Sequence, residues 1–280
     1  MDRIINLNIP HIGEQIFENF EDEELIQLLS VSETWRVLAS NVLLQRWRGR
    51  FADACYLASP ELVKFLLANL KTEEIWNVHE NGCTPFQSAC LGGNKEIVEL
   101  ILDHPDIKSM DLNAVDENGR TAFQWACALE KSEIVQLLLD RPNSKSIDFN
   151  AVDANGRTAY QWACEMEKNE VVQLLLDHPK SKNIDLNAVD KYGRTPFQSA
   201  CLMGHKEVVQ ILLDYSNSKN IDLNTVDENG RTVFFWACRL GRKEVVQLLL
   251  ESNASIDFTI PENTFFPREF EYLLKKFGKM

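Results

Sequence analysis

The sequence predicts an all-α protein in which a small helical module precedes a solenoid of repeated helix-turn-helix units. The main observation is a turn glycine that recurs every 37 residues, at Gly82, Gly119, Gly156, Gly193 and Gly230. An apolar block follows each glycine, and a second apolar block comes about a dozen residues later. The first fifty residues lack this repeat, but their apolar residues have helical spacing.

The segment from Leu7 to Trp47 divides into three expected helices. The apolar residues that would line them, in chain order, are Ile12, Ile16 and Phe17, then Leu25, Leu28 and Leu29, then Trp35, Leu38 and Leu43. The acidic run from Glu21 to Glu24 favours the start of the second helix, because negative charge stabilises a helix N-terminus.

This segment resembles the F-box, a small helical module that docks on a Skp-family linker protein of a cullin ubiquitin ligase. The matching residues are Ile9 and Pro10 at the Leu-Pro start, the early apolar pair Ile16 and Phe17, Val31 at the Val-Cys step, and the core and closing tryptophans Trp35 and Trp47. The departures from the pattern are Gly13, Gln15, Phe20 and Ser32.

The F-box resemblance implies a set of apolar linker-binding candidates, some of which must instead belong to the module's own core. They are Ile9, Pro10, Ile16, Phe17, Leu28, Leu29 and Val31. The alternative is that these helices only cover the open end of the solenoid, since every such stack requires caps.

The first block of each repeat reads RTAFQWAC from Arg120 or a variant of it, and the second reads EIVQLLLD from Glu133 or a variant. We expect a turn, a short helix, a tight reversal and a longer second helix. Neither helix can bury its apolar face alone, so neighbouring units must stack. The expected N-cap residues of the short helices are Thr84, Thr121, Thr158, Thr195 and Thr232.

This pattern resembles the ankyrin family, whose signature is Thr-Pro-Leu-His-x-Ala followed by an apolar helix, at about 33 residues per repeat. The resemblance implies an F-box-like module at residues 1–49 and an ankyrin-repeat solenoid at 50–280. Clear repeats would start near residues 79, 116, 153, 190 and 227, with degenerate capping units at 50–78 and 255–280.

Two features depart from the ankyrin pattern. The additional residues of the 37-residue period fall in stretches such as 104–113 and 178–187, where they lengthen the link to the next turn. Glutamine replaces the usual histidine at Gln87, Gln124, Gln161 and Gln198, and Phe235 in the last copy cannot form a side-chain hydrogen bond. A recurring asparagine is expected to hold the turn that leads into the next unit, at Asn113, Asn150, Asn187 and Asn224.

Ankyrin repeats typically grip a partner with their turn tips and the exposed end of each first helix, and the copies differ at these positions. The resemblance therefore implies the following partner-binding residues: Glu117, Asn118, Arg120, Leu129, Asn155, Arg157, Glu165, Met166, Lys191, Tyr192, Arg194, Met203, Glu228, Asn229, Arg231 and Arg239, with Ala128, Ala154, Leu202 and Leu240 beside them.

The tip arginines form a ladder, at Arg120, Arg157, Arg194 and Arg231. Because a guanidinium can fork to a carboxylate, an acidic or phosphorylated segment is one expected target. In the alternative, each arginine pairs with a neighbouring Asp or Glu along the turn edge.

Five cysteines recur at one position of the first helix: Cys90, Cys127, Cys164, Cys201 and Cys238. We expect small buried core residues, because packed helices lie about 8–10 Å apart, too far for a disulfide. Cys55 joins this column, whereas Cys83 occupies a turn position and is expected to be an exposed thiol, which implies a reducing compartment. Another recurring set, which we expect to pack in the core, is Trp125, Trp162 and Trp236.

Nothing in the sequence predicts catalysis. The five histidines show no metal-ligand spacing, and no phosphate loop, HExxH or GxSxG motif is present. We therefore expect a protein that is not an enzyme and that uses neither a metal nor a cofactor.

The charge balance argues against nucleic acid as a partner. Twenty-nine basic and 42 acidic residues give a formal net charge of −13, which repels a phosphate backbone. No apolar run approaches the roughly 20 residues of a membrane helix, and no secretory signal is visible. We expect a cytoplasmic protein, with the nucleus left open as a second location.

A docking module followed by a recognition solenoid suggests the substrate-recognition subunit of an SCF-type cullin ubiquitin ligase. Its partners would be a Skp-family linker protein and a substrate protein that the repeat surface does not identify. The alternative is an ankyrin scaffold with no ubiquitin role.

Overall fold

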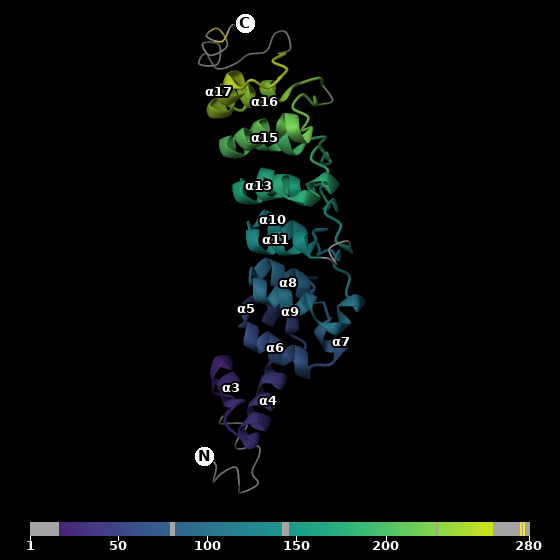
Figure 1. Cartoon of the computed structure of the whole chain (residues 1–280), viewed down its shortest axis with the longest axis vertical. Coiled ribbons are helices and arrows are strands. Elements are labelled where there is room, and N and C mark those ends of the chain that lie inside the picture. The colour runs from purple at the N-terminus through teal and green to yellow at the C-terminus, as the bar shows by residue number, and fades with distance from the viewer. Residues whose placement is uncertain are drawn as a thin grey trace. The chain divides into compact units, whose positions relative to one another are not determined.

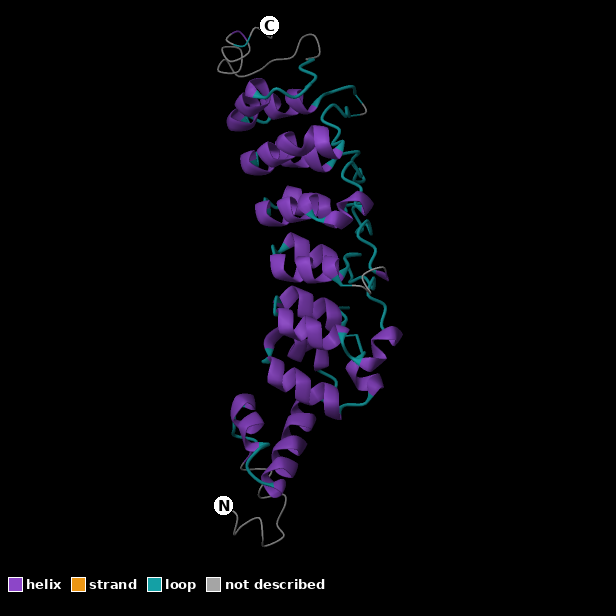
Figure 2. Ribbon diagram, in the orientation of Figure 1, coloured by secondary structure: helices purple, strands orange, loops and turns teal. Residues whose placement is uncertain are grey.

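The computed structural model describes residues 17–78, 82–141, 146–227 and 229–259, together with 275 and 277. Within those ranges every regular element is a helix (Figure 2), which confirms the predicted all-α class. The chain divides into two compact units, residues 1–117 and 118–280. None of the described helices is long and apolar enough to cross a membrane.

The first unit begins with α3 (Asp22–Leu28) and α4 (Glu33–Trp47) (Figure 1). At the start of α3, the backbone N–H of Glu21 donates to the Glu24 carboxylate at 2.9 Å. Ser32 Oγ caps α4 by accepting the N–H of Trp35 at 3.4 Å. The second and third predicted N-terminal helices are confirmed, whereas the first falls almost entirely outside the described residues.

A carboxylate ties the start of α3 to the end of α4. Asp22 accepts the indole N–H of Trp47 at 2.9 Å and pairs with the Arg46 guanidinium. Arg46 also donates to the carbonyl of Phe20 at 3.1 Å. Because Phe17 packs beside the Trp35 ring at a centroid distance of 5.4 Å, the helix pair has an apolar core of its own.

Helix pairs form the rest of the first unit, with α5 packed on α8 and α6 packed on α9. The elements are α5 (Phe51–Leu57), α6 (Pro60–Asn69), α7 (Thr72–Ile75), α8 (Pro85–Gly92), α9 (Lys95–Leu102) and the 3₁₀ helix η1 (Pro105–Ser109).

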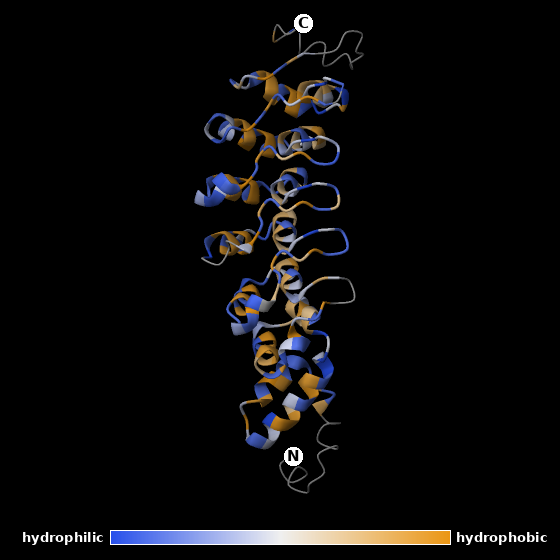
Figure 3. Ribbon diagram, turned by 90° about the vertical axis from the view of Figure 1, so that its right-hand side faces the viewer, coloured by the Kyte–Doolittle hydropathy of each residue, from blue (hydrophilic) through white to orange (hydrophobic). Residues whose placement is uncertain are grey.

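The second unit stacks four helix pairs, in which first helices pack on first helices and second helices on second helices. The first helices are α10 (Ala122–Ala128), α12 (Ala159–Glu165), α14 (Pro196–Met203) and α16 (Val233–Arg239). The second helices are α11 (Ser132–Asp140), α13 (Asn169–Asp177), α15 (Lys206–Lys219) and α17 (Lys243–Glu251), and a 3₁₀ helix, η3 (Pro179–Asn183), follows α13. Each helix carries both hydrophobic and hydrophilic residues (Figure 3), as the stacking requires. The capping unit predicted at 255–280 lies mostly outside the described residues.

The predicted threonine caps are confirmed in every described repeat. The hydroxyl oxygen of each threonine accepts the backbone N–H three residues later, at Thr84, Thr121, Thr158, Thr195 and Thr232. This bond satisfies one of the free N–H groups at the helix start.

The second helices differ in length, and a proline marks the end of α13. Pro179 follows α13 after one residue, and the chain turns into η3 there, because proline lacks the N–H that a continuing α-helix needs. Ser216 occupies the corresponding position of the next repeat, and α15 runs on to Lys219 before Asn220 ends it in the left-handed conformation (φ 53°). The longer link predicted from the 37-residue period is therefore a short 3₁₀ helix in one repeat and an extended α-helix in the next.

The recurring asparagines of the second unit, Asn150, Asn187 and Asn224, bridge each repeat to the following link. Asn187 Nδ2 donates to the carbonyl of Asn220 at 2.9 Å, and its Oδ1 accepts the N–H of Asp222 at 2.8 Å. Asn150 forms the same two bonds with Asn183 and Asp185. The asparagines thus hold the links of consecutive repeats in register, which goes beyond the predicted role within one turn.

We predict that Asn187→Ala lowers the free energy of unfolding by about 1–2 kcal/mol, because it removes two hydrogen bonds to the backbone of the next repeat. Urea unfolding followed by circular dichroism measures this. Asn217→Ala, on the exposed face of α15, is the matched control and should leave stability unchanged or slightly raised. Equal effects of the two substitutions would contradict the bridging role.

Candidate protein-binding surface

An aspartate builds each described turn tip of the second unit. Asp153 Oδ1 accepts the backbone N–H groups of Asn155 at 2.8 Å and Arg157 at 2.9 Å. Gly156 completes the turn with φ of 74°, and a Cβ there would lie 3.0 Å from the backbone N of Lys191. Only glycine therefore fits the turn.

Neighbouring tips are joined through their backbones. The N–H of Ala154 donates to the carbonyl of Asn118 at 3.1 Å, and the N–H of Lys191 donates to the carbonyl of Asn155 at 2.9 Å. The tips consequently form a row that is fixed by main-chain bonds and does not depend on the variable side chains.

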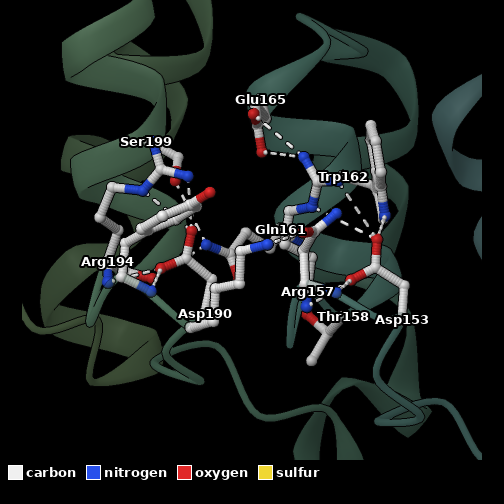
Figure 4. A network of polar contacts seen from close by, with 12 residues as sticks. Asp153, Arg157, Thr158, Gln161, Trp162, Glu165, Asp190, Arg194 and Ser199 are labelled. Carbon is white, nitrogen blue, oxygen red and sulfur yellow. Dashed lines mark hydrogen bonds and ion pairs between the residues drawn. The ribbon is translucent and has the colours of Figure 1, made fainter.

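Arg157 connects a tip to the first helix of the same repeat (Figure 4). Its guanidinium forms ion pairs with Asp153 and Glu165, each at 3.3 Å. The guanidinium carbon also lies 3.7 Å from the ring centroid of Trp162, whose indole N–H donates to Asp153 at 3.1 Å. The cation is thus paired with carboxylates and stacked on an aromatic ring at once.

The stacking extends between repeats. The Arg120 guanidinium carbon lies 4.6 Å from the ring centroid of Trp125 and 4.5 Å from that of Trp162, so this cation sits between indoles of two successive repeats. Arg231 stacks on Trp236 at 4.4 Å in the same way.

One repeat of the second unit has Ser199 in place of the tryptophan. There Arg194 pairs with Asp190 at 2.6 Å and lies 4.8 Å from the ring centroid of Tyr192. Of the two roles that the sequence leaves open for the arginine ladder, the structure shows the pairing within the chain at Arg157, Arg194 and Arg231.

The tryptophan column is only partly in the core. Trp162 is buried, as predicted, but Trp125 and Trp236 are half-buried. All three rings contact guanidiniums, and the buried Trp162 contacts two of them, those of Arg120 and Arg157. The prediction that all three are core residues is therefore wrong for Trp125 and Trp236.

The glutamines join each first helix to the following turn. Gln124 Nε2 donates to the carbonyls of Ala151 and Arg157, both at 2.9 Å. In the last repeat Phe235 cannot make this bond, and the Thr232 hydroxyl donates instead to the carbonyl of Thr259 at 3.3 Å.

The predicted partner-binding residues differ in their exposure. Those whose side chains are exposed are Glu117, Asn118, Leu129, Met166, Lys191, Tyr192, Met203, Asn229 and Arg239. The half-buried ones are Arg120, Asn155, Arg157, Glu165, Arg194 and Arg231. The side chain of Glu228 lies outside the described residues.

The structure reveals exposed apolar residues that the sequence reasoning missed. A valine precedes the aspartate of each tip and is about half exposed, at Val115, Val152, Val189 and Val226. The sequence held one signal for them, because the same valine stands at this position in every copy. A repeated apolar residue ordinarily fills a core, but these valines are exposed. They adjoin the tips and enlarge the candidate surface.

The predicted linker-binding residues separate into an inner and an outer group. Phe17 is fully buried, so its side chain serves the core of the α3–α4 pair. Leu28 and Leu29 are half-buried, and Val31 is 59% exposed. Ile9, Pro10 and Ile16 lie outside the described residues.

All seven cysteines are free and buried. This confirms the core prediction for the repeated column, but the prediction of an exposed Cys83 thiol is wrong, because the side chain is enclosed at its turn. Burial raises the pKa of Cys83, and the charges of Asp116 and Glu117 raise it further. Burial also raises the pKa of Cys238 to about 12. Within the described residues, no His, Cys, Asp and Glu side chains gather as a metal site would require.

We predict that Arg157→Lys lowers the free energy of unfolding by about 1–2 kcal/mol, because an ammonium keeps the charge but loses the planar stack and the fork to two carboxylates. Chemical denaturation measures the difference. Arg239→Lys at an exposed position should stay within about 0.5 kcal/mol of the parent chain. If Arg157→Lys leaves the free energy of unfolding unchanged, the structural role of Arg157 is contradicted.

The cysteines should react slowly in the folded protein. All seven are buried, and burial raises the pKa of six of them, Cys55, Cys83, Cys90, Cys164, Cys201 and Cys238. A raised pKa leaves little thiolate near neutral pH, and the thiolate is the reactive form. Timed modification with a thiol reagent at pH 8 should therefore be slow in buffer and fast in urea. Rapid reaction in buffer of any of the six column thiols, Cys55, Cys90, Cys127, Cys164, Cys201 and Cys238, would refute the buried column.

Comparisons with known proteins agree with this architecture. The family described as ankyrin repeats in three copies matches residues 51–153, 107–190, 145–227 and 182–260. No curated protein matches the chain, whereas 530 chains of solved structures do. One is the crystal structure of the ankyrin repeat domain of Bcl-3, "a unique member of the IkappaB protein family". It is 26% identical, with a TM-score of 0.61, over 73% of this chain and 86% of that one. The chain belongs to the ankyrin-repeat family, whose repeats are protein-interaction modules and are typically not enzymes.

Proposed function

We propose that this protein is the substrate-recognition subunit of an SCF-type cullin ubiquitin ligase. In this role the repeats hold a target protein, and the N-terminal helices attach the complex to a Skp-family linker protein. The exposure of Val31 is the observation that carries the ligase part of the proposal. An apolar side chain that is 59% exposed beside a helix pair with its own core is available for a partner.

Further apolar surface near Val31 supports a docking role. Leu28 and Leu29 end α3 with half-buried side chains, and Val37 on the following helix is 50% exposed. Arg36 Nε donates to the carbonyl of Leu29 at 3.1 Å, which fixes the connection between α3 and α4. Leu28, Leu29 and Val31 thus offer a linker protein apolar side chains at an ordered connection.

The competing function is an ankyrin scaffold with no ubiquitin role. It is favoured by the packing of α3 on α6, since covering a helix of the first repeat is what a cap does. One helix pair can act both as a cap and as a docking module. Only a measurement of linker binding therefore distinguishes the two functions.

The seven free cysteines fit a reducing compartment, because none of them forms a disulfide. We accordingly place the proposed receptor in the cytoplasm, with the nucleus as a second location.

Val31→Glu should abolish co-purification of the full chain with a Skp-family linker protein, because burying a carboxylate in an apolar contact is strongly unfavourable. Removal of residues 1–49 should have the same effect. Val152→Glu, at an equally apolar exposed position in the repeats, should retain the linker.

Circular dichroism and the unfolding midpoint should match the parent chain for both point variants. If the parent chain fails to bind the linker, or if Val31→Glu binds as well as the parent, the ligase proposal is excluded and the scaffold function stands.

A further inference from the structure

The second unit carries two columns of exposed apolar residues, each with one member per repeat. The valine column consists of Val152, Val189 and Val226, which are 45–54% exposed. The helix-end column consists of Leu129, Met166, Met203 and Leu240, which are 37–46% exposed.

The Arg157 network places the two columns along the same surface. Val152 directly precedes Asp153, and Met166 directly follows Glu165. Since one guanidinium pairs with both carboxylates, the tip and the helix end lie within reach of a single side chain (Figure 4). From this we infer that the columns border one strip of surface, and we call the stacked arginines and tryptophans between them its floor.

This floor offers little net charge to a ligand. Arg157, Arg194 and Arg231 are each paired with an aspartate of their own tip. An anionic ligand would have to displace these carboxylates, so charge complementarity favours an uncharged segment over an acidic or phosphorylated one.

Aromatic rings add to the character of the floor. Trp125 and Trp236 are half-buried, and Tyr192 is 63% exposed. Grooves lined by aromatic side chains and polar donors are the usual binding sites for polyproline II segments.

The spacing of the repeats fits the same conformation. Packed helices lie about 8–10 Å apart, which sets the distance between successive members of a column. A polyproline II segment turns once in three residues and rises about 3.1 Å per residue, so equivalent side chains recur about every 9 Å. A fully extended strand repeats its face after about 6.6–6.8 Å and would lose register within two repeats.

We propose that the strip between the two columns binds an uncharged polyproline II segment of a partner protein, at three ligand residues per repeat. One residue of each triplet contacts the valine column, the next contacts the helix-end column, and the third faces solvent. The proposal rests on the partner-binding role of the repeats and identifies the class of segment that they take.

The test uses the full-length chain and a fluorescent peptide that repeats Leu-Pro-Gln four times, with fluorescence anisotropy as the readout. We expect saturable binding that changes little with salt, because no ion pairs form. Three peptides of similar length serve for comparison: one that alternates Leu and Gln, one with Glu in place of Leu, and a helical heptad peptide. Each should bind at least about tenfold more weakly.

Val189→Glu and Met203→Glu should each weaken binding of the Leu-Pro-Gln peptide by at least about tenfold. Val31→Glu lies in the other unit and should have no effect, so the failure of this proposal is distinguishable from the failure of linker docking. Absence of binding at millimolar peptide, or equal or tighter binding of the acidic, alternating or helical peptide, would overturn the proposal.

Discussion

The structure depends on the fact that no helix pair of this chain can bury its apolar face alone. Within each unit, first helices pack on first helices and second helices on second helices. Burial is approximately proportional to the apolar area removed from water, so the stability of one repeat comes largely from its neighbours. Stacking of this kind is nondirectional, and it does not by itself fix the rotation or offset of one repeat on the next.

Polar side chains at fixed positions supply that direction. Gln124 joins a first helix to the following turn, Asn187 joins one link to the next, and the Arg120 guanidinium lies between the rings of two repeats. Each contact uses a residue type that recurs with the 37-residue period, with Phe235 in place of the glutamine and Ser199 in place of the tryptophan as the exceptions, so the register is specified repeatedly along the stack. The same contacts pair the arginines within the chain. The exposed apolar residues beside the tips are therefore the groups that a partner can contact.

Sequence reasoning succeeded where one residue type has one dominant local use. The threonine caps, the buried cysteine column and the second and third N-terminal helices were predicted because capping, small-residue packing and helical spacing are local properties. The role of Arg157 could not be decided, since it depends on the distances to Asp153, Glu165 and the Trp162 ring. The valines were missed because contact positions were sought where the copies differ, and the valines are identical. Cys83 was misjudged because enclosure of a turn residue depends on the tertiary structure around it.

The most direct test of the structural role of the tip arginines is hydrogen exchange at the Arg157 Nε–H, measured by NMR in the folded chain. This group donates to Asp153 at 3.3 Å, and the guanidinium is stacked on Trp162. Exchange at Arg157 should be much slower than at the exposed Arg239, and the tip amides of Ala154 and Lys191 should also exchange slowly. If Arg157 exchanges as fast as Arg239, the guanidinium is open to a partner, and the claim that the tip arginines serve the stack is contradicted.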